Sequence, residues 1–254
     1  MDRQFDRAVL ITGAGSGIGA ATALAVAGSG TALLLHTRQN QSGLDEIARQ
    51  CRERGSVVET MLGDLAEPAV PQTLVRATRQ HFGRIDQIVS NAGQAHKSTF
   101  GALTPEDVER AFAAMPLAFV RLATAALSDL ESSDWARVVV VSSFVAHVFG
   151  TNNLLFPASA AAKAALEALA KSLASQLAPQ GVTVNCVVPG FTRKDQSGHA
   201  ATSREAMESA TGVTPIGRLA EPGDIANGIV YLLSRGARQV TGQTLHIDGG
   251  LMLP

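Results

Sequence analysis

The stretch Thr12-Gly13-Ala14-Gly15-Ser16-Gly17-Ile18-Gly19 follows directly on the apolar run Ala8-Val9-Leu10-Ile11. A glycine-rich turn between a strand and a helix lets the backbone approach a pyrophosphate and aims free helical N–H groups at that anion. Glycines 13, 17 and 19 fit that need, and Gly15-x-Gly17-x-x-Ala20 also meets the looser dinucleotide pattern. We therefore expect residues 12–19 to leave a first strand, bind a nucleotide phosphate and enter a first helix.

Outward from this loop, short β-rich runs alternate with longer helical patterns. Several runs are apolar throughout, such as residues 138–141, which is typical of strands covered by helices on both faces. The pattern predicts one α/β domain over 1–254, a Rossmann-type doubly wound parallel sheet of about seven strands with helices on both faces. The predicted strands are 7–12, 31–36, 57–62, 85–90, 136–142, 182–188 and 243–247, and predicted helices include 17–29, 41–54, 68–82, 105–130 and 158–179.

Residues 192–215 break this alternation. The segment is polar, contains glycine and serine, and is weakly patterned. In a compact α/β enzyme such a segment is more typical of a mobile lid over the substrate than of a second domain.

Charge and composition exclude several classes of protein. Lys and Arg number 21 against 22 for Asp and Glu, and no basic run predicts nucleic-acid binding. No apolar run approaches the roughly 18 residues of a spanning helix, and the N-terminus lacks the apolar core of a signal peptide. Cys51 and Cys186 lack metal-ligand spacing, which predicts two inert thiols, no metal and a reducing, cytoplasmic setting.

Further motifs fall at the ends of the predicted strands. Asp64-Leu65 follows the third strand and Asn91-Ala92-Gly93 the fourth, Ser142-Ser143 ends the fifth, and Pro189-Gly190 follows the sixth. With the glycine loop and the tail motifs at 217–222 and 241–250, the chain resembles the single-domain short-chain dehydrogenase/reductase family over nearly its whole length. It is similar to the 3-oxoacyl-acyl-carrier-protein reductases of that family.

The resemblance implies a nicotinamide cofactor and its binding residues. Asp64 and Leu65 would border the adenine, Asn91, Ala92 and Gly93 would lie near the ribose, and Pro189, Gly190 and Thr192 would meet the nicotinamide. Lys163 would bind a ribose of the cofactor. The glycine-loop residues in this implied set are Gly13, Ser16, Gly17, Ile18 and Gly19.

The end of the second predicted strand bears on which cofactor binds. An enzyme that prefers NAD places a carboxylate there for the 2′-hydroxyl, whereas this chain has Thr37 followed by Arg38. A carboxylate would repel a 2′-phosphate, and an arginine can bind one in a fork, so we expect NADP(H) in preference to NAD(H). The alternative is that Arg38 is only a solvated cation of the loop and does not select the cofactor. Ser16 stands in the glycine loop where NADP enzymes often carry a basic residue, so that position does not favour NADP(H).

This chain keeps two of the four catalytic residues of the family. Its members use a tyrosine as acid, a lysine that lowers the tyrosine pKa, a serine that holds the substrate oxygen and an asparagine in a water relay. Ser143 and Lys163 match the serine and the lysine, but Ser159 stands at the tyrosine position and Met115 at the asparagine position. The longer tyrosine-to-lysine spacing of the enoyl reductases falls on Phe156, so it supplies no tyrosine either.

Loss of the tyrosine removes the usual general acid, which typically costs about 10²–10⁴ in rate. Ser159 is a far weaker acid with a shorter side chain, and if the missing phenol limits the reaction, Ser159→Tyr should raise ketone reduction. His147, on the loop after Ser143, is the candidate replacement, since histidine can donate a proton near neutral pH. Weaker candidates are His96, Asn152, Asn153 and a water held by Ser143 and Lys163; Tyr231, the single tyrosine, is expected to pack within an apolar helix.

Three readings of the function stay open. The first is an NADP(H)-dependent oxidoreductase with an atypical proton donor, acting on a small carbonyl or alcohol or an activated C=C bond. The second is a catalytically inactive nucleotide-binding homologue acting as a partner or sensor, and the third a lyase, dehydratase or dehalogenase. The resemblance also implies a homotetramer, pairing helices near 105–130 and 158–179 across one two-fold axis and segments near 221–234 and 243–247 across another. The stripe Leu166, Leu169, Leu173 and Leu177 and the ending Leu251-Met252-Leu253 support this assembly.

Overall fold

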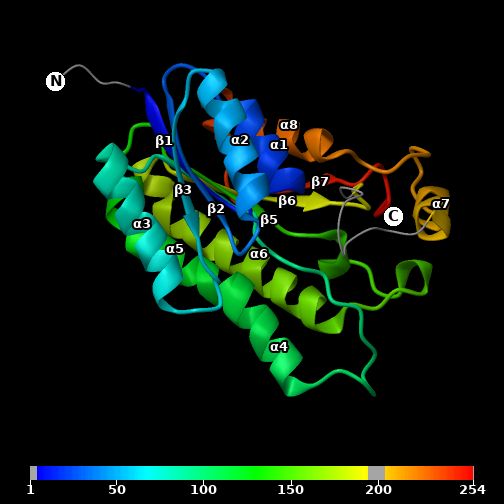
Figure 1. Ribbon diagram of the computed structural model, residues 1–254. Helices are drawn as coiled ribbons and strands as arrows, with labels where there is room; N and C mark the ends of the chain where they lie inside the picture. Colours follow the sequence, from blue (N-terminus) through cyan, green and yellow to red (C-terminus); the bar gives the residue numbers. More distant parts are fainter. Residues whose placement is uncertain (1–4, 194–203, 254) are drawn as a thin grey trace.

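The computed structural model describes residues 5–193 and 204–253 and contains a seven-stranded sheet in which all the pairings are parallel (Figure 1). The strand order is β3-β2-β1-β4-β5-β6-β7, so the chain winds outward from β1 in both directions. The Rossmann-type doubly wound sheet predicted from the sequence is confirmed. The strands are β1 Arg7–Thr12, β2 Thr31–Thr37, β3 Val57–Leu62, β4 Gln87–Ser90, β5 Arg137–Val141, β6 Thr183–Pro189 and β7 Thr244–Ile247.

Helices cover both faces of this sheet (Figure 1). One face carries α1 (Gly17–Val26), α2 (Gln41–Glu53) and α8 (Pro222–Leu233). The other carries α3 (Ala69–Phe82), α5 (Ala118–Ser132) and α6 (Pro157–Leu177), with α4 (Pro105–Phe112) leading into α5 through the π-helical turn η1 (Ala113–Leu117). The short α7 (Arg204–Gly212) lies beyond the sheet edge, and the remaining short turns are η2 Phe144–Ala146, η3 Thr151–Asn153, η4 Ala178–Gln180 and η5 Arg235–Ala237.

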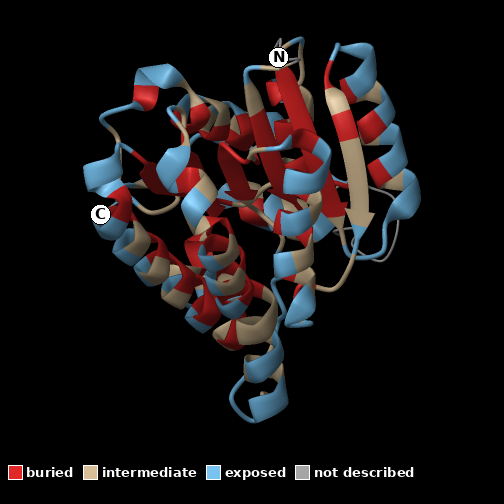
Figure 2. Cartoon of the chain, turned by 90° about the vertical axis from the view of Figure 1, so that its left-hand side faces the viewer, coloured by how far each residue is buried: buried red, intermediate tan, exposed pale blue. Residues whose placement is uncertain are grey.

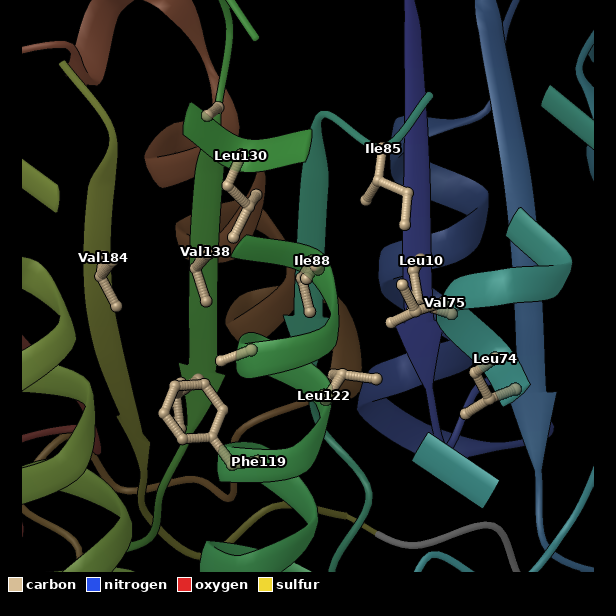
Figure 3. Packing of buried hydrophobic residues seen from close by; sticks show 14 of the residues in the cluster. Leu10, Leu74, Val75, Ile85, Ile88, Phe119, Leu122, Leu130, Val138 and Val184 are labelled. Atoms are coloured by element: carbon tan, nitrogen blue, oxygen red, sulfur yellow. The ribbon is translucent and has the colours of Figure 1, made fainter. Parts of the chain in front are cut away.

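The apolar strands bury both of their faces because successive side chains point to opposite sides of the sheet. Leu10 and Val138 face the α3/α5/α6 layer, whereas their neighbours Val9 and Val139 face the α1/α2/α8 layer. Figure 3 shows Leu10 beside Val75 of α3, and Val138 between Leu130 and Phe119 of α5. Two hydrophobic cores therefore sandwich the sheet, and the buried strands stand out against exposed helix surfaces in Figure 2.

The strand order places the functional loops. β1 pairs with β2 on one side and with β4 on the other, so the connections from these strands diverge at the carboxyl ends of β1 and β4. In open parallel sheets a crevice forms at this switch point, and ligands bind there. The loops after β1, at residues 13–16, and after β4, at residues 91–93, border it.

The helical stretch Pro105–Ser132 departs from expectation in two ways. By length and composition alone it could cross a membrane, which the sequence analysis did not foresee. Its inner face carries Phe119, Leu122 and Leu130 of the core, as in the core helix of a globular protein. Pro116, which lacks a backbone donor, lies within the π-helical turn η1 rather than in regular α-helix.

The weakly patterned segment 192–215 is helical in part. Residues 204–212 of it form α7, a helix that the sequence analysis did not predict, while residues 194–203 lie outside the described part of the chain. The lid function of 192–215 stays a prediction.

Candidate cofactor and substrate site

The glycine loop after β1 is shaped by close backbone packing. A Cβ on Gly19 would lie 2.1 Å from the carbonyl oxygen of Gly13, so only glycine fits. Gly17 has a φ of +55°, and a Cβ there would meet nothing within 4 Å, which leaves open space above the loop. Ser16 is exposed and extended at the start of α1, and no described side chain caps that helix. The first N–H groups of α1 are therefore available to an anion, as predicted for a phosphate loop.

Asn91 ties the two sides of the crevice together. Its Nδ2 donates to the carbonyl oxygens of Thr12 and Gly13 at 2.9 and 3.1 Å. The Thr12 hydroxyl in turn accepts from the backbone N–H groups of Asn91 and Ala92 at 3.0 and 3.1 Å. These bonds fix the β4 loop, including Gly93, against the glycine loop at the switch point.

The adenosine end of the crevice lies at the ends of β2 and β3. Thr37 ends β2, and a Cβ on Gly15 would lie 3.2 Å from its Oγ1, so Thr37 borders the glycine loop. Asn40 anchors the same loop by donating to the Gly15 carbonyl at 2.9 Å. Arg38 is exposed, and within the described residues its guanidinium makes no hydrogen bond or ion pair.

The remaining predicted cofactor residues also lie at carboxyl ends of strands. Asp64 follows β3, and its carboxylate accepts from Ala66 N at 2.9 Å beside the buried Leu65. Pro189 ends β6, and a Cβ on Gly190 would lie 2.7 Å from the Asp248 Cα. Thr192 donates to the Gly190 carbonyl at 3.1 Å. Ile18, in the first turn of α1, packs against the core on the α1/α2/α8 face.

Lys163 lies beside this cofactor wall. It is buried on α6, and its Nζ donates to the carbonyl oxygen of Val141 at 2.6 Å. A Cβ on Gly93 would lie 3.0 Å from the same Nζ, so the ammonium borders the β4 loop. Burial lowers the pKa of Lys163 from 10.5 to about 8, because the charged form loses its hydration.

Ser159 does not present its hydroxyl to a substrate. The side chain is 2% exposed, its Oγ donates to the Gln94 carbonyl at 3.2 Å, and the same Oγ accepts from His96 N at 3.0 Å. These bonds hold the 94–96 loop against the first turn of α6, where the tyrosine of the resembled family would begin. A tyrosine at 159 would have to displace that loop, so Ser159→Tyr is now expected not to restore the missing acid.

Ser142 and Ser143 point to opposite sides of the chain. Ser142 continues the sheet ladder through its N–H to the Val187 carbonyl, and Ser143 is extended with a φ of −167°. Successive side chains of extended backbone alternate, so Ser143 faces away from the partner of Ser142. That partner is Glu167, which accepts from the Ser142 hydroxyl and from His147 Nε2, the latter at 2.9 Å.

His147 therefore shares its carboxylate partner with Ser142. Its imidazole contacts Glu167 and lies 5.1 Å, ring to ring, from His246 on β7. The sequence analysis placed His147 on the right loop but missed Glu167. A signal was available, since Glu167 lies four residues after Lys163 on a helix of Ala and Leu, and therefore on the same face.

The other replaced positions are apolar. Met115 is buried, and a Cβ on Gly93 would lie 3.1 Å from its sulfur. Phe156 precedes α6 and packs with Phe144 and Phe191 in a third small cluster. Asn152 has a φ of 58° and accepts from the Ser209 hydroxyl of α7 at 2.6 Å, while Asn153 has a φ of 55°.

Tyr231 is not in the site. It lies on α8 and is 51% exposed, so the expectation that it packs inside the chain is wrong.

A doubly wound parallel sheet with a glycine loop, an uncapped helix start and a buried lysine at its switch point is the arrangement of nicotinamide-dependent oxidoreductases. Comparison with known proteins agrees. Residues 13–252 match the family described as enoyl-(acyl carrier protein) reductase. An uncharacterised oxidoreductase of Mycobacterium tuberculosis is 35% identical, over 100% of this chain and 95% of that protein. The 3-oxoacyl-[acyl-carrier-protein] reductase of Escherichia coli is 29% identical, over 87% of this chain and 88% of that enzyme.

A solved structure extends the comparison. L-sorbose reductase from Gluconobacter frateurii, complexed with NADPH and L-sorbose, superposes with a TM-score of 0.89 at 27% identity and covers 100% of both chains. The chain belongs to the short-chain dehydrogenase/reductase family, as the sequence motifs indicated.

The buried Lys163 generates a prediction about stability. Its fall in pKa from 10.5 to about 8 corresponds to roughly 3 kcal/mol of cost to the folded state at neutral pH. The unfolded chain binds the extra proton between pH 8 and 10.5, so the cost is complete below pH 8 and disappears as the pH rises to 10.5. Lys163→Met should therefore raise the free energy of unfolding by about 1–3 kcal/mol at pH 7, and by much less at pH 10.

Urea unfolding of both proteins at the two pH values measures this difference. Lys171→Met, on the exposed side of the same helix, is the control and should change stability little at either pH. An equal difference at pH 7 and pH 10 would show that burial of the charge is not its cause.

Proposed function

We propose that this protein is an NADP(H)-dependent reductase or dehydrogenase of a small carbonyl or alcohol, or of a C=C bond activated by a carbonyl. The observation that carries the proposal is Lys163, a buried ammonium held between the Val141 carbonyl and Gly93. A buried ammonium destabilises the fold and contributes nothing to the helix that carries it. A reaction that forms an oxyanion, in contrast, is helped by a cation or proton donor beside the reacting oxygen.

The site fits a dinucleotide. The open space above Gly17 and the uncapped start of α1 suit a pyrophosphate, and Gly93 and Asn91 form a wall beside Lys163. When bound, the cofactor supplies or accepts a hydride at its nicotinamide. Pro189, Gly190 and Thr192, at the end of β6, would hold that ring, and Asp64 and Leu65 would border the adenine.

Arg38 supports NADP(H) over NAD(H). Its guanidinium is exposed and unpaired within the described residues, beside Thr37 and next to the glycine loop. An unpaired guanidinium can bind a 2′-phosphate with two hydrogen bonds, and no carboxylate follows β2 to repel the phosphate. The related L-sorbose reductase is complexed with NADPH.

The protein's residues would divide the proton chemistry as follows. Ser143, which points away from Glu167, would donate a hydrogen bond to the carbonyl oxygen. Lys163, with a pKa of about 8, is mostly protonated at pH 7 and would give its proton to the oxyanion. Ser159 would act by positioning the 94–96 loop, and His147 through its bond to Glu167.

The inactive partner or sensor is the second candidate. It is favoured by the hydroxyl of Ser159, which is fully engaged by the loop, and by the apolar Met115. Both candidates bind the same cofactor, so turnover separates them.

The assembly we propose is a homotetramer. Of the predicted leucine stripe, Leu166 and Leu177 are core residues of the chain itself, while Leu169 and Leu173 are partly buried. Beside them α6 exposes Ala161, Ala164 and Ala168, small side chains that permit close approach of a second α6. On the other edge, Tyr231 and Leu245 expose apolar surface on α8 and β7.

We also propose that the protein is located in the cytoplasm. Cys51 and Cys186 are free, buried thiols, and burial raises their pKa to about 11 and about 12. Unpaired thiols of this kind suit a reducing compartment.

NADPH should bind more tightly than NADH, by about tenfold or more, because Arg38 forms charge-assisted hydrogen bonds to the 2′-phosphate. Isothermal titration of both nucleotides measures this. Arg38→Ala should weaken NADPH binding alone, whereas Arg76→Ala, an exposed arginine on α3, should change neither. Equal affinities in the parent protein would contradict the assignment.

Incubation with NADPH and a panel of ketones, aldehydes and enones, followed at the nicotinamide absorbance, tests turnover. We expect slow reduction of at least one class, reduced about 10²–10⁴-fold by Lys163→Met because the acid is lost. Ser159→Ala should cost less than Lys163→Met, and the matched Ser172→Ala on the exposed face of α6 should cost nothing. NADPH binding without any turnover would favour the inactive homologue.

Light scattering at micromolar concentration should give the mass of a tetramer. Ala164→Arg and Ala168→Arg, which place charge where α6 should meet its copy, should each shift the mass toward a dimer. Gln176→Arg, further along the same helix, is the control. A monomeric parent protein would refute the assembly.

A further inference from the structure

A groove lies between the segment that follows β5 and the first turns of α6. It has a volume of about 430 Å³ and is bordered on its third side by the loop that precedes α4. Thr99 and Thr151 supply the only side-chain hydroxyls among the described residues that line it, and none of those residues is charged. The other side chains of the lining are apolar, so the groove suits an apolar group.

The floor of the groove is rigid without a ligand. Phe144, Val145 and Ala160 line it, and all three are buried. They belong to one apolar cluster, in which the ring centroid of Phe144 lies 4.5 Å from that of Phe191, beyond the end of β6. A wall that is already packed loses little conformational freedom when a ligand binds, which favours affinity.

The floor begins at Ser143, the residue that would hold the substrate oxygen. The Ser143 hydroxyl caps η2 by accepting from Val145 N at 3.4 Å, so its own proton stays available to an oxygen of the substrate. Phe144 and Val145, which follow Ser143 directly, line the groove. A carbonyl bonded to Ser143 therefore has the groove beside it.

Two phenylalanines at the edge of the groove leave most of their surface in water. Phe100 is 84% exposed and Phe149 is 74% exposed. Both line the same groove, together with the partly exposed Leu155, so their exposure forms one patch rather than scattered residues. Contiguous exposed apolar surface of this kind marks a ligand-binding groove or an interaction site.

The shape of the groove favours a small molecule over a second copy of the chain. Its edges are fixed by hydrogen bonds, because the Leu155 carbonyl accepts from Ser98 N at 3.2 Å and Asn152 accepts from the Ser209 hydroxyl of α7 at 2.6 Å. The volume exceeds the roughly 150 Å³ of a cavity that binds one benzene ring. A helix about 10–12 Å across would fill it with a single turn.

We propose that the substrate is a carbonyl compound with an apolar substituent, an alkyl chain or a ring, that lies in this groove while the carbonyl oxygen lies at Ser143. The inference rests on the proposed reductase function and names its substrate class. Val148 and Phe149 are then residues that determine specificity. A polyol such as a sugar is a poor ligand, because its hydroxyls would lose water in the groove without finding partners.

Binding can be measured without turnover. The ligands are straight-chain methyl ketones of four, six and eight carbons, added to protein saturated with NADP⁺, which has no hydride to give. Protein labelled with ¹³C in the Val and Leu methyl groups reports binding by NMR, and loss of signals in Val148→Ala and Leu154→Ala assigns two residues of the lining.

The dissociation constant should fall about 15-fold from each ketone to the next, since each methylene that leaves water contributes about fourfold. L-Sorbose at the same concentrations should leave the signals of Val148 and Leu154 unmoved. In an active enzyme, kcat/KM with NADPH should rise in the same order of chain length.

Val148→Trp should fill part of the groove and weaken binding of the eight-carbon ketone about tenfold or more, followed at Leu154. Binding of the four-carbon ketone and of NADP⁺ should stay unchanged. The matched control is Val120→Trp, at an exposed valine of α5 outside the groove lining, which should change none of these values. Phe149→Ser, at an exposed position, should weaken binding of the eight-carbon ketone several-fold, and it decides the question if Val148→Trp does not fold.

A dissociation constant that does not depend on chain length, or equal weakening by Val120→Trp, would overturn the proposal. If no ketone binds and Phe149→Ser lowers the mass in light scattering, a second copy occupies the groove and the proposal is wrong. Failure of the reductase function gives a different result: the ketones bind with the expected dependence on chain length, but NADPH is not consumed.

Discussion

The close approach of two backbone segments at the carboxyl end of β1 is the constraint on which the site depends. Gly19 packs so tightly on the Gly13 carbonyl that no Cβ fits, and Asn91 bonds the carbonyl oxygens of Thr12 and Gly13. This junction joins the first βα unit to β4 and leaves the start of α1 uncapped. A phosphate site therefore follows from the packing of the fold itself, and the family's cofactor chemistry is built around it.

The second feature that determines the chemistry of the site is the electrostatic environment of Lys163. Lys163 is buried against the Val141 carbonyl and Gly93, where loss of hydration lowers its pKa to about 8. An ordinary lysine is a poor acid at neutral pH, whereas this one lies within range of releasing and recovering a proton. The same burial destabilises the fold, and active-site groups often lower the stability of a protein in this way.

The structure explains how this chain accommodates the residues that differ from the family's catalytic set. Ser159 replaces a catalytic phenol but is not a shortened version of it, because its hydroxyl holds the 94–96 loop in the space beside α6. Met115 closes the side where the family places an asparagine. Glu167 and His147 add a bonded polar pair one helical turn from Lys163. The replacements thus rearrange the surroundings of Lys163 while the cofactor wall keeps the residues of the family.

The sequence by itself determined the fold and the cofactor loops, since strand runs such as 7–12 and the glycine spacing at 13–19 are local patterns that few structures satisfy. It also located Ser143 and Lys163, because their order along the chain follows the strands. It could not show that Ser159 is bonded to Gln94, that Tyr231 is exposed, or that His147 is bonded to Glu167. The two hydrogen bonds join residues 20 and 65 positions apart in the sequence, and the exposure of Tyr231 depends on which face of α8 packs on the sheet, so only the folded chain decides them.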